Sequence, residues 1–588
     1  MSLRDFEKNL KKEYNETFKE HKPRFRFTFK LRHALAIVVV MLGLFLIVEH
    51  MSVSIYNNKL DKERKNLYDI NETSFVKLEK IDDYKNVVGL KNNKTSILSK
   101  CFRVFSIKSY VKYDTEAELA GSNARTEMAE EKTGAIAPEA SVENATNTNV
   151  QVTGIDEADY SKCDGTYIYS LHYGNFMIFD LSGTKIVNKK VSMNLNNLYI
   201  YEDKIILIGT ATTVIYKFDG NDLTELKTFN YKFYNDSRLT NNYFYLIFNN
   251  DFDNEQEYKD MYYDQVSYTN RVYSIIKYDL DSNEYKEVNN LNSGNVTLYM
   301  SNQHIYLATT VYARGSDYFE MTVTSVFDHD LNPIAALRVK GTVLNQFSMD
   351  EYDKYFRIVT TNNQAENEKL NAISIFDLEN RTLVGYLNEG IGLGRQVVKS
   401  VRFDDTTCYV VTYLNTDPLY EIDLTDPANP KIVSEYQSPG YSSYLHTFIA
   451  NGEEYLFGIG YCDDQSTRKI SVYKNDENTT QIGSDLIISD YFYTTSDNNL
   501  LKVNEINYKA LNDHRALFIY QKNDILYLGI KASPTEYYFF KIDVTSENVI
   551  SVYDTIQFNE HFYYSRCYLV NNKIYITNGH NLYIKEVK

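Results

Sequence analysis

The densest group of residues that could do chemistry is the run Ile155-Asp156-Glu157-Ala158-Asp159. Its three carboxylates, Asp156, Glu157 and Asp159, could supply oxygen ligands to a hard cation such as calcium. They could equally accept backbone N–H bonds and pair with an arginine such as Arg402 or Arg515, which would lock a structural seam. We favour the seam, because the spacing lacks the full set of oxygen donors that a calcium loop provides. No other cofactor is expected.

Two histidines lie beside hydroxyl and carboxyl groups. His446 follows Ser442-Ser443, and His514 lies between Asp513 and Arg515. A Ser, His and Asp triad is defined by a geometry that spacing alone does not give, whereas buried polar groups always need hydrogen-bond partners. The favoured interpretation is that these residues and Arg402 make hydrogen bonds between structural units. The sequence contains no G-x-S-x-G elbow, phosphate loop or H-E-x-x-H zinc helix, so an enzyme is the less favoured class.

The elements that carry these residues are short runs of β-branched and aromatic residues bounded by Asp, Asn, Pro and Gly. Between residues 401 and 440, four such runs fit within about forty residues, which is typical of one antiparallel meander sheet. The same unit recurs to the end of the chain, and such repetition predicts a β-propeller. The units start near Ala158, Asn196, Ser237, Asn295, Asn345, Val397, Tyr441, His514 and Tyr564.

The predicted fold is therefore all-β, a propeller of 8 to 9 four-stranded blades over residues 149–588. The last unit contains only three strands before the sequence ends. An unpaired outer edge is a liability for a sheet protein, and Val150-Gln151-Val152 is the candidate fourth strand.

Composition and charge agree with an all-β body outside the cytoplasm. The 53 Tyr and 31 Phe favour strands. The net charge is -17, but residues 1–32 hold ten Lys and Arg against five Asp and Glu, so the remainder is near -22. An acidic body makes nucleic acid an unsuitable partner. The five cysteines form no CxxC pair, and a Cys408 to Cys462 bridge is the one pairing worth testing.

The N-terminal region predicts a membrane anchor. Residues 1–33 are polar and basic, and an uninterrupted apolar run follows over residues 34–48. Extended to residue 56, this segment is long enough to cross a bilayer. We favour an uncleaved signal anchor over a cleaved signal peptide, because the basic region is long and no small-x-small site follows the apolar run. The positive-inside rule then predicts a cytoplasmic N-terminus and an extracellular propeller in a single-pass protein of the cell membrane.

Two further segments separate the anchor from the repeats. Residues 57–113 mix charged and apolar residues and predict a juxtamembrane helix or small cap. Residues 114–148 contain almost no large apolar residue, so we expect a disordered linker. Within the repeats, Asp251–Asn270 is too long for an ordinary hairpin loop and is either a contact surface or a solvated loop.

Several ungapped motifs resemble a known family. They include residues 148–159, Cys163-Asp164-Gly165-Thr166-Tyr167, Gly440-Tyr441-Ser442-Ser443-Tyr444-Leu445-His446 and Asp513-His514-Arg515-Ala516. The chain is similar to the uncharacterised bacterial and archaeal family of secreted or membrane-anchored proteins with a C-terminal β-propeller, itself distantly similar to WD repeats. The resemblance implies the propeller fold and an extracytoplasmic place, and it implies no reaction.

Three functions are compatible with this organisation. The first is a membrane-anchored extracytoplasmic propeller that acts as a binding scaffold for a protein or a cell-envelope polymer. The second is a propeller hydrolase or lyase, since the fold alone excludes neither. The third is a sensor subunit of a membrane signalling complex. We favour the binding scaffold, because anchor, linker and repeats occur without a catalytic motif.

Overall fold

The computed structural model describes most of the repeat region and parts of the N-terminal region. The described residues are 148–586, apart from short gaps that mostly lie in loops, together with 27–68, 73–81 and a few isolated N-terminal positions. Contacts divide the chain into two units, of which one holds residues 1–63 and 92–123 and the other residues 64–91 and 124–588.

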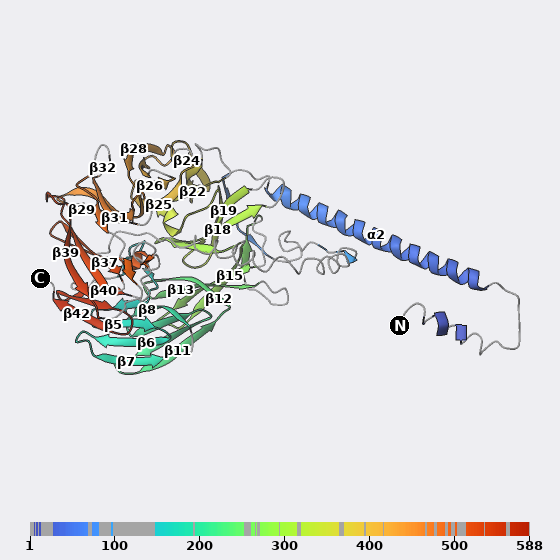
Figure 1. The fold of residues 1–588 in the computed structure, drawn as a ribbon, viewed down its shortest axis with the longest axis horizontal. Coiled ribbons are helices and arrows are strands. Elements are labelled where there is room, and N and C mark those ends of the chain that lie inside the picture. The colour runs from blue at the N-terminus through green and yellow to red at the C-terminus, as the bar shows by residue number, and fades with distance from the viewer. Residues whose placement is uncertain are drawn as a thin grey trace. The chain divides into compact units, whose positions relative to one another are not determined.

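The second unit contains nine consecutive sheets, which we number as blades 1 to 9 (Figure 1). Blade 1 contains β4 (Ser161–Cys163), β5 (Tyr167–His172), β6 (Asn175–Asp180) and β7 (Lys185–Lys190). Blade 2 contains β8 (Leu195–Tyr201), β9 (Lys204–Gly209), β10 (Thr212–Phe218) and β11 (Leu223–Asn230). Blade 3 contains β12 (Phe233–Thr240), β13 (Tyr243–Asp251), β15 (Arg271–Asp279) and β16 (Tyr285–Asn292).

Blade 4 contains β17 (Val296–Met300), β18 (His304–Ala313), β19 (Phe319–Asp328) and β20 (Pro333–Lys340). Blade 5 follows the short 3-10 helix η3 (Gln346–Ser348) and contains β21 (Met349–Tyr352), β22 (Tyr355–Thr361), β23 (Asn371–Asp377) and β24 (Thr382–Leu387). Blade 6 contains β25 (Val397–Asp404), β26 (Thr407–Tyr413), β27 (Asp417–Asp423) and β28 (Lys431–Ser438).

Blade 7 contains β29 (Tyr441–Ala450), β30 (Glu453–Tyr461), β31 (Arg468–Lys474), β32 (Thr480–Gln481) and β33 (Leu486–Ile488), and the separate hairpin of β34 (Phe492–Thr494) and β35 (Leu500–Lys502) follows it. Blade 8 follows the 3-10 helix η5 (His514–Ala516) and contains β36 (Phe518–Lys522), β37 (Ile525–Ser533), β38 (Glu536–Ile542) and β39 (Ile550–Gln557). Blade 9 contains β40 (Arg566–Val570), β41 (Lys573–Thr577) and β42 (Leu582–Glu586).

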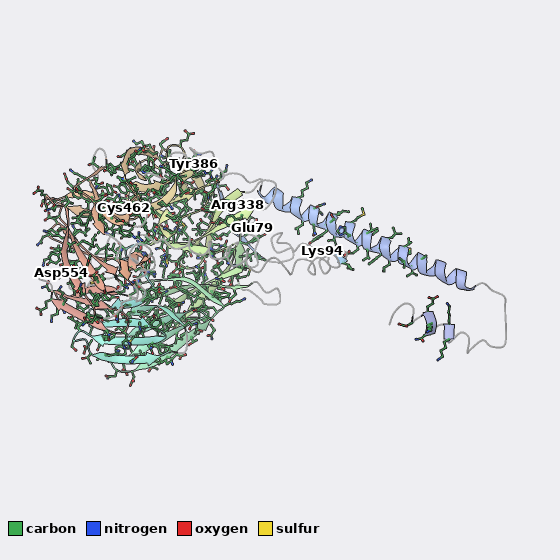
Figure 2. The ribbon with its side chains drawn as sticks, viewed as in Figure 1. Glu79, Lys94, Arg338, Tyr386, Cys462 and Asp554 are labelled. Atoms are coloured by element: carbon green, nitrogen blue, oxygen red, sulfur yellow. The ribbon has the colours of Figure 1, made fainter. Side chains whose placement is uncertain are left out.

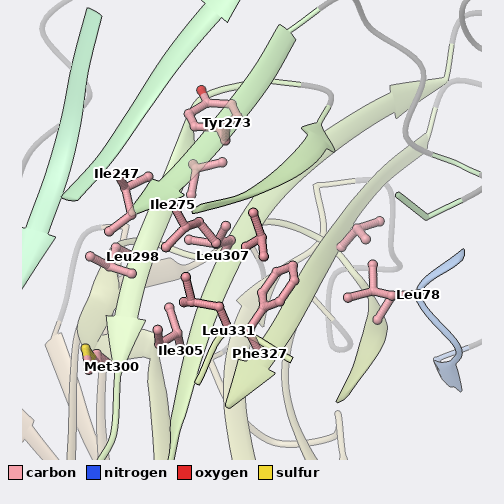
Figure 3. Packing of buried hydrophobic residues seen from close by; sticks show 14 of the residues in the cluster. Leu78, Ile247, Tyr273, Ile275, Leu298, Met300, Ile305, Leu307, Phe327 and Leu331 are labelled. Carbon is pink, nitrogen blue, oxygen red and sulfur yellow. The ribbon is translucent and has the colours of Figure 1, made fainter. Parts of the chain in front are cut away.

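Buried apolar side chains join each blade to the next and close the ring. The cluster between blades 3 and 4, for example, packs Ile247 and Ile275 against Leu298 and Leu307 (Figure 3). A further cluster joins blade 9 to blade 1, with Tyr568 and its neighbours against Ile168, Met177 and Phe179. The predicted propeller is confirmed, with nine sheets in the described part of the chain. Each predicted unit start lies within a few residues of the first strand of a blade.

The predicted fourth strand of the last blade is wrong. Residues 150–152 form no strand, and Gln151 instead donates from Nε2 to the carbonyl oxygens of Gln346 and Met349, both 3.2 Å away, at the start of blade 5. Within the residues described, no strand pairs with the outer edge of β42. Side-chain packing, and not a shared sheet, therefore joins the last blade to the first.

Two short strands before the repeats belong to the propeller and were not predicted. β1 (Ser74–Val76) pairs antiparallel with β20 of blade 4, and β2 (Glu79–Lys80) pairs with β14 (Met261–Tyr263), which itself runs parallel to β16 of blade 3. Leu78 between them is 3% exposed and lies in the core shared by blades 3 and 4 (Figure 3). We call residues 73–81 the strap.

The strap and the insertion after β13 stabilise one another. Tyr263 donates a hydrogen bond to Glu79, and the neighbouring Asp264 accepts two hydrogen bonds of 3.0 Å from Arg338 of β20. Glu79 and Arg338 are labelled in Figure 2. The described part of the insertion is thus a structural element, whereas most of residues 252–270 lies outside the described residues. The juxtamembrane helix or small cap expected over residues 57–113 is also described only in part: α2 extends through residues 57–68, and the strap contains strands.

The first unit contains the long helix α2 (Phe27–Tyr68) as far as Glu63. Its stretch Val38–Leu60 has a mean hydropathy of 2.2 and is long and apolar enough to cross a membrane. A signal sequence near the N-terminus has the same character. The predicted linker, residues 114–148, lies outside the described residues except for its last position. Cys408 and Cys462 are both free, so the one pairing worth testing does not form in this structure.

The strap generates the first prediction. Leu78→Ala should lower the free energy of unfolding by about 2 to 5 kcal/mol, because it leaves a cavity between two packed blades. The matched control is Lys77→Ala, since the Lys77 side chain is exposed. Urea unfolding followed by tyrosine fluorescence measures both. Equal stabilities of the two variants would show that the strap does not contribute to the core.

Candidate functional site

The segment immediately before blade 1 lies along the inner strands of the ring. We call residues 148–160 the axial segment. Its β3 (Asp156–Glu157) pairs antiparallel with β12, the inner strand of blade 3. Asp159 pairs through its backbone with Leu198 of blade 2. Asn149 donates from Nδ2 to the hydroxyl of Tyr444 in blade 7 and to the carbonyl oxygen of His514 in η5, both at 3.0 Å. The segment therefore contacts blades on several sides of the ring.

Glu157 is the most connected carboxylate of the axial segment. Its Oε1 accepts a 2.9 Å hydrogen bond from Gln346, and Arg238 of blade 3 in turn donates to the Gln346 side-chain oxygen at 2.9 Å. Its Oε2 lies 2.9 Å from His514 Nε2, which is ion-pair distance without the alignment of a hydrogen bond. Burial alone would raise the pKa of Glu157, but His514 and Arg238 hold it well below its usual range. Glu157 is thus an ionised carboxylate that links three parts of the ring.

Asp159 and Asp513 share one arginine from the last blade. Arg566 donates from Nε and Nη2 to Asp159 at 2.7 and 2.6 Å, and Nη2 also lies 2.6 Å from Asp513. Arg515 donates from Nε to Asp513 at 2.7 Å and from Nη1 to the Ala158 carbonyl oxygen. Burial alone would raise the pKa of Asp513, yet Arg515 and Arg566 hold it well below its usual range. This cluster joins the axial segment to blades 8 and 9.

The three carboxylates of the candidate metal site contact three different basic side chains. Asp156 pairs with Lys162 at 2.5 Å, Glu157 with His514, and Asp159 with Arg566. Lys162 also donates to Thr148 at 2.9 Å. Among the described residues, no group of three acidic, histidine or cysteine side chains could hold a metal ion. The contacts favour the seam over calcium, with Arg566 as the main partner in place of Arg402.

The two histidines are not brought together as a catalytic pair. His446 Nδ1 lies 3.1 Å from the Tyr444 hydroxyl, which connects it to Asn149. The Ser443 hydroxyl donates to the Ile459 carbonyl oxygen rather than to a histidine. Asp513 binds arginines and not His514. The Ser, His and Asp residues considered as a possible triad therefore have different hydrogen-bond partners and do not bind one another.

A cavity of about 360 Å³ lies where blades 4, 5 and 6 meet the axial segment. Turn residues 301–303 of blade 4, residues 347–353 at the start of blade 5, and residues 402–405 of blade 6 line it, with residues 151–153 from the axial segment. The turns place Asp353 and Asp405 in the left-handed region, at φ 56° and 43°, which Asp tolerates better than most residues. The cavity is thus built by adjacent hairpin turns, and we call it the turn pocket.

Three of the charged groups that line the turn pocket, Asp350, Glu351 and Arg357, have side-chain partners. Arg357 donates from Nε to Asp350 at 2.9 Å and lies over the rings of Tyr352 and Phe403. Glu351 accepts hydrogen bonds from three donors on blade 4. They are the hydroxyls of Ser301 and Tyr306 and the ring of His304.

Arg402 lacks an ion pair. Its side chain is buried, its Nε has no hydrogen-bond partner, and within the described residues its hydrogen bond runs from Nη2 to the Thr447 hydroxyl at 3.5 Å. Desolvation lowers the pKa of Arg402, because no carboxylate in the described structure lies within ion-pair distance. From the sequence, Arg402 was expected to pair with the carboxylates of the seam.

Several residues of the axial network had no signal in the sequence. Gln346, Arg238 and Arg566 occur in ordinary strand or turn contexts, and their partners in the axial segment lie 81 to 407 positions away. The one usable clue to Arg566 was its place in the inner strand of the closing blade.

Comparison with known proteins agrees with this architecture. The family model described as "Beta propeller domain" matches residues 145–588, so the chain belongs to that family. An uncharacterized protein of Methanocaldococcus jannaschii is 39% identical over 157 residues, which is 26% of this chain and 24% of that protein. An uncharacterized protein of Archaeoglobus fulgidus is 36% identical over 154 residues, which is 26% of this chain and 23% of that protein. The match thus spans about a quarter of each of these relatives.

Solved structures similar to the chain share little sequence with it. Apo AztD from Citrobacter koseri is 11% identical, with 74% of this chain and 98% of that chain covered and a TM-score of 0.36. Hsv2p from Kluyveromyces lactis is 13% identical, with 62% and 99% covered and a TM-score of 0.32.

The ionised Glu157 generates a prediction about pH. Glu157→Gln should lower the free energy of unfolding by about 2 kcal/mol at pH 7, because charge-assisted hydrogen bonds are lost. A carboxylate with a lowered folded-state pKa stabilises the fold above its unfolded-state pKa near 4.5, and this contribution is lost as the pH falls below that value. The difference between wild type and variant should therefore shrink between pH 6 and pH 3.

Urea unfolding at several pH values measures this difference. Glu202→Gln is a suitable control, since Glu202 lies in an exposed turn. A difference between Glu157→Gln and wild type that stays constant with pH would contradict the assigned charge.

Proposed function

We propose that the chain is a membrane-anchored, extracytoplasmic β-propeller that acts as a binding module for a protein or a cell-envelope polymer. The observation that carries this proposal is a turn pocket with unpaired polar groups beside an axial segment that is fully engaged with the ring. Glu157, Asp159 and Asn149 hold that segment along the inner strands. The polar groups of the axial segment are therefore occupied, whereas polar side chains at the hairpin turns remain available to a ligand. Propellers commonly bind through such loop faces.

The charge distribution supports the anchor and its orientation. α2 carries the apolar stretch Val38–Leu60, and the ten basic residues of positions 1–32 precede it. Positive charge beside a span is retained on the cytoplasmic side. The propeller then lies outside, as a cell-surface or extracytoplasmic body of a single-pass protein.

In the sequence, five positions lie between the last residue of α2 and the first residue of β1, which pairs with blade 4. The strap and the axial segment both belong to the propeller unit.

A hydrolase or lyase needs an acid and a base that converge on a substrate. Two carboxylates can serve as acid and base, but in the turn pocket Asp350 is bound by Arg357 and Glu351 by donors of blade 4. The described His446 and His514 are engaged elsewhere. The geometry therefore favours binding over catalysis.

The anchor is tested by placing charge in the span. Leu42→Arg combined with Phe45→Arg should move the protein from the membrane pellet to the soluble fraction, because each arginine costs roughly 2.5 to 3.5 kcal/mol near the centre of a span. Leu42→Ala with Phe45→Ala is the matched control. Carbonate extraction followed by immunoblotting measures the distribution. A doubly substituted arginine variant that stays in the pellet would contradict a spanning anchor.

The binding face is tested at two exposed turn residues. Asp353→Asn with Asp405→Asn removes two charges while keeping residues that tolerate a positive φ, so we expect at least about tenfold weaker binding of the full chain to isolated cell-envelope material. Asp222→Asn, in an exposed turn of blade 2, is the control. Co-sedimentation measures retention. Equal retention of all three proteins would show that the turn pocket is not the binding face.

A further inference from the structure

The buried arginines of the propeller show what is unusual about Arg402. Arg238 pairs with Asp236 at 2.8 Å, Arg338 with Asp264 at 2.9 Å, and Arg566 with Asp159 at 2.6 Å. Arg402 is only 5% exposed and has no ion pair in the described structure. An unpaired buried charge is costly, and guanidinium keeps its charge in proteins. The fold thus retains a cation for which the described residues supply no counter-charge within ion-pair distance.

Neighbouring groups do not neutralise this charge. Asp404, Asp350 and Glu454 act on Arg402 only from beyond ion-pair distance, and Asp350 is already bound by Arg357. Burial, and then the charge of Arg402, hold the pKa of His446 well below its usual range, so this imidazole is neutral at pH 7. Arg402 is therefore the cation available at the base of the turn pocket.

Carboxylates without ion-pair partners lie at the rim of the same pocket. Asp404 is half-buried and Asp405 is exposed, and neither makes a side-chain hydrogen bond or ion pair in the part of the chain that the structure describes. Asp404 follows Arg402 by two positions on β25, so both side chains lie on one face of the sheet, about 7 Å apart along the strand. The pocket thus presents positive charge at its base and negative charge at its rim.

From this arrangement we propose that the turn pocket binds a small zwitterion, whose free carboxylate pairs with Arg402 and whose ammonium group pairs with Asp404 and Asp405. A guanidinium can bind a carboxylate through two parallel hydrogen bonds. A multiply charged anion would be repelled by the rim, and a simple cation by Arg402. A cavity of about 360 Å³ lies at the small end of the range for ligand sites, which suits an α-amino acid or a dipeptide. The proposal rests on the turn pocket being the binding face.

The experiment uses the full chain in detergent and two readouts, the melting temperature and calorimetric titration. The probes are glycylglycine and L-lysine as zwitterions, acetate and inorganic phosphate as anions, and putrescine as a cation. A ligand that binds only the folded form raises the melting temperature. The zwitterions should raise it more than any other probe, and Arg402→Met should weaken their binding at least about tenfold.

Two variants separate a binding role from a structural one. Without ligand, Arg402→Met should melt at or above the wild-type temperature, because it removes an unpaired buried charge. Arg566→Met should melt well below wild type, because it leaves Asp159 and Asp513 without their cation. Asp404→Asn should keep the weak response to acetate and lose the preference for zwitterions over acetate.

Three outcomes would overturn the proposal. Tighter binding of phosphate or acetate than of glycylglycine would identify a plain anion site. The absence of any response to zwitterions would reject the ligand class. Destabilisation of Arg402→Met as severe as that of Arg566→Met would make Arg402 structural. If one of these outcomes occurs but the Asp353→Asn, Asp405→Asn variant loses envelope binding, the proposed function stands and only the zwitterion is rejected. If that variant keeps envelope binding as well, both the proposed function and the zwitterion are rejected.

Discussion

The closed ring depends on the pairing of Arg566 with Asp159 and Asp513. The last blade lacks a fourth strand among the described residues, so backbone hydrogen bonds do not join it to the start of the ring. A bidentate arginine of the inner strand β40 binds the axial segment instead, with contacts of 2.6 to 2.7 Å. In a buried site such a pair is strong only when its remaining donors are also satisfied, and Asp513 and the Ser565 carbonyl oxygen satisfy them here.

In a propeller closed by strand exchange, a shared sheet holds the first and last blades together. Here the axial segment holds the nine blades in place. Glu157, Asp159 and Asn149 each contact a different set of inner strands or turns, and their contacts with Gln346, Arg566 and Tyr444 bridge residues far apart in the chain. Many weak constraints along one segment fix the relative positions of blades that otherwise touch only their neighbours. The polar centre of the ring is therefore a structural element, and this makes it a poor place for a diffusible ligand.

The architecture could be predicted from sequence because each blade is a local pattern. Alternating apolar residues and Asp- or Asn-rich turns identify strands within about ten residues, and the predicted unit starts agree with the first strands, β4 to β40. The strap was missed because β1 and β2 contain three and two residues and are strands only where blades 3 and 4 receive them. Val150-Gln151-Val152 does not complete blade 9 as a fourth strand. The Gln151 side chain donates hydrogen bonds to the start of blade 5 instead.

The sequence identified residues of the candidate site but not their contacts. Asp156, Glu157 and Asp159 were identified because three carboxylates occur within four positions. Their partners Lys162, His514 and Arg566 were not identified, because they lie on three different elements. Arg402 shows the converse. The sequence reading placed it in the seam beside Asp156, Glu157 and Asp159, whereas in the fold these carboxylates contact Lys162, His514 and Arg566. What distinguishes it is a missing partner, which no sequence pattern records, and selection for stability alone would have replaced it with an apolar residue.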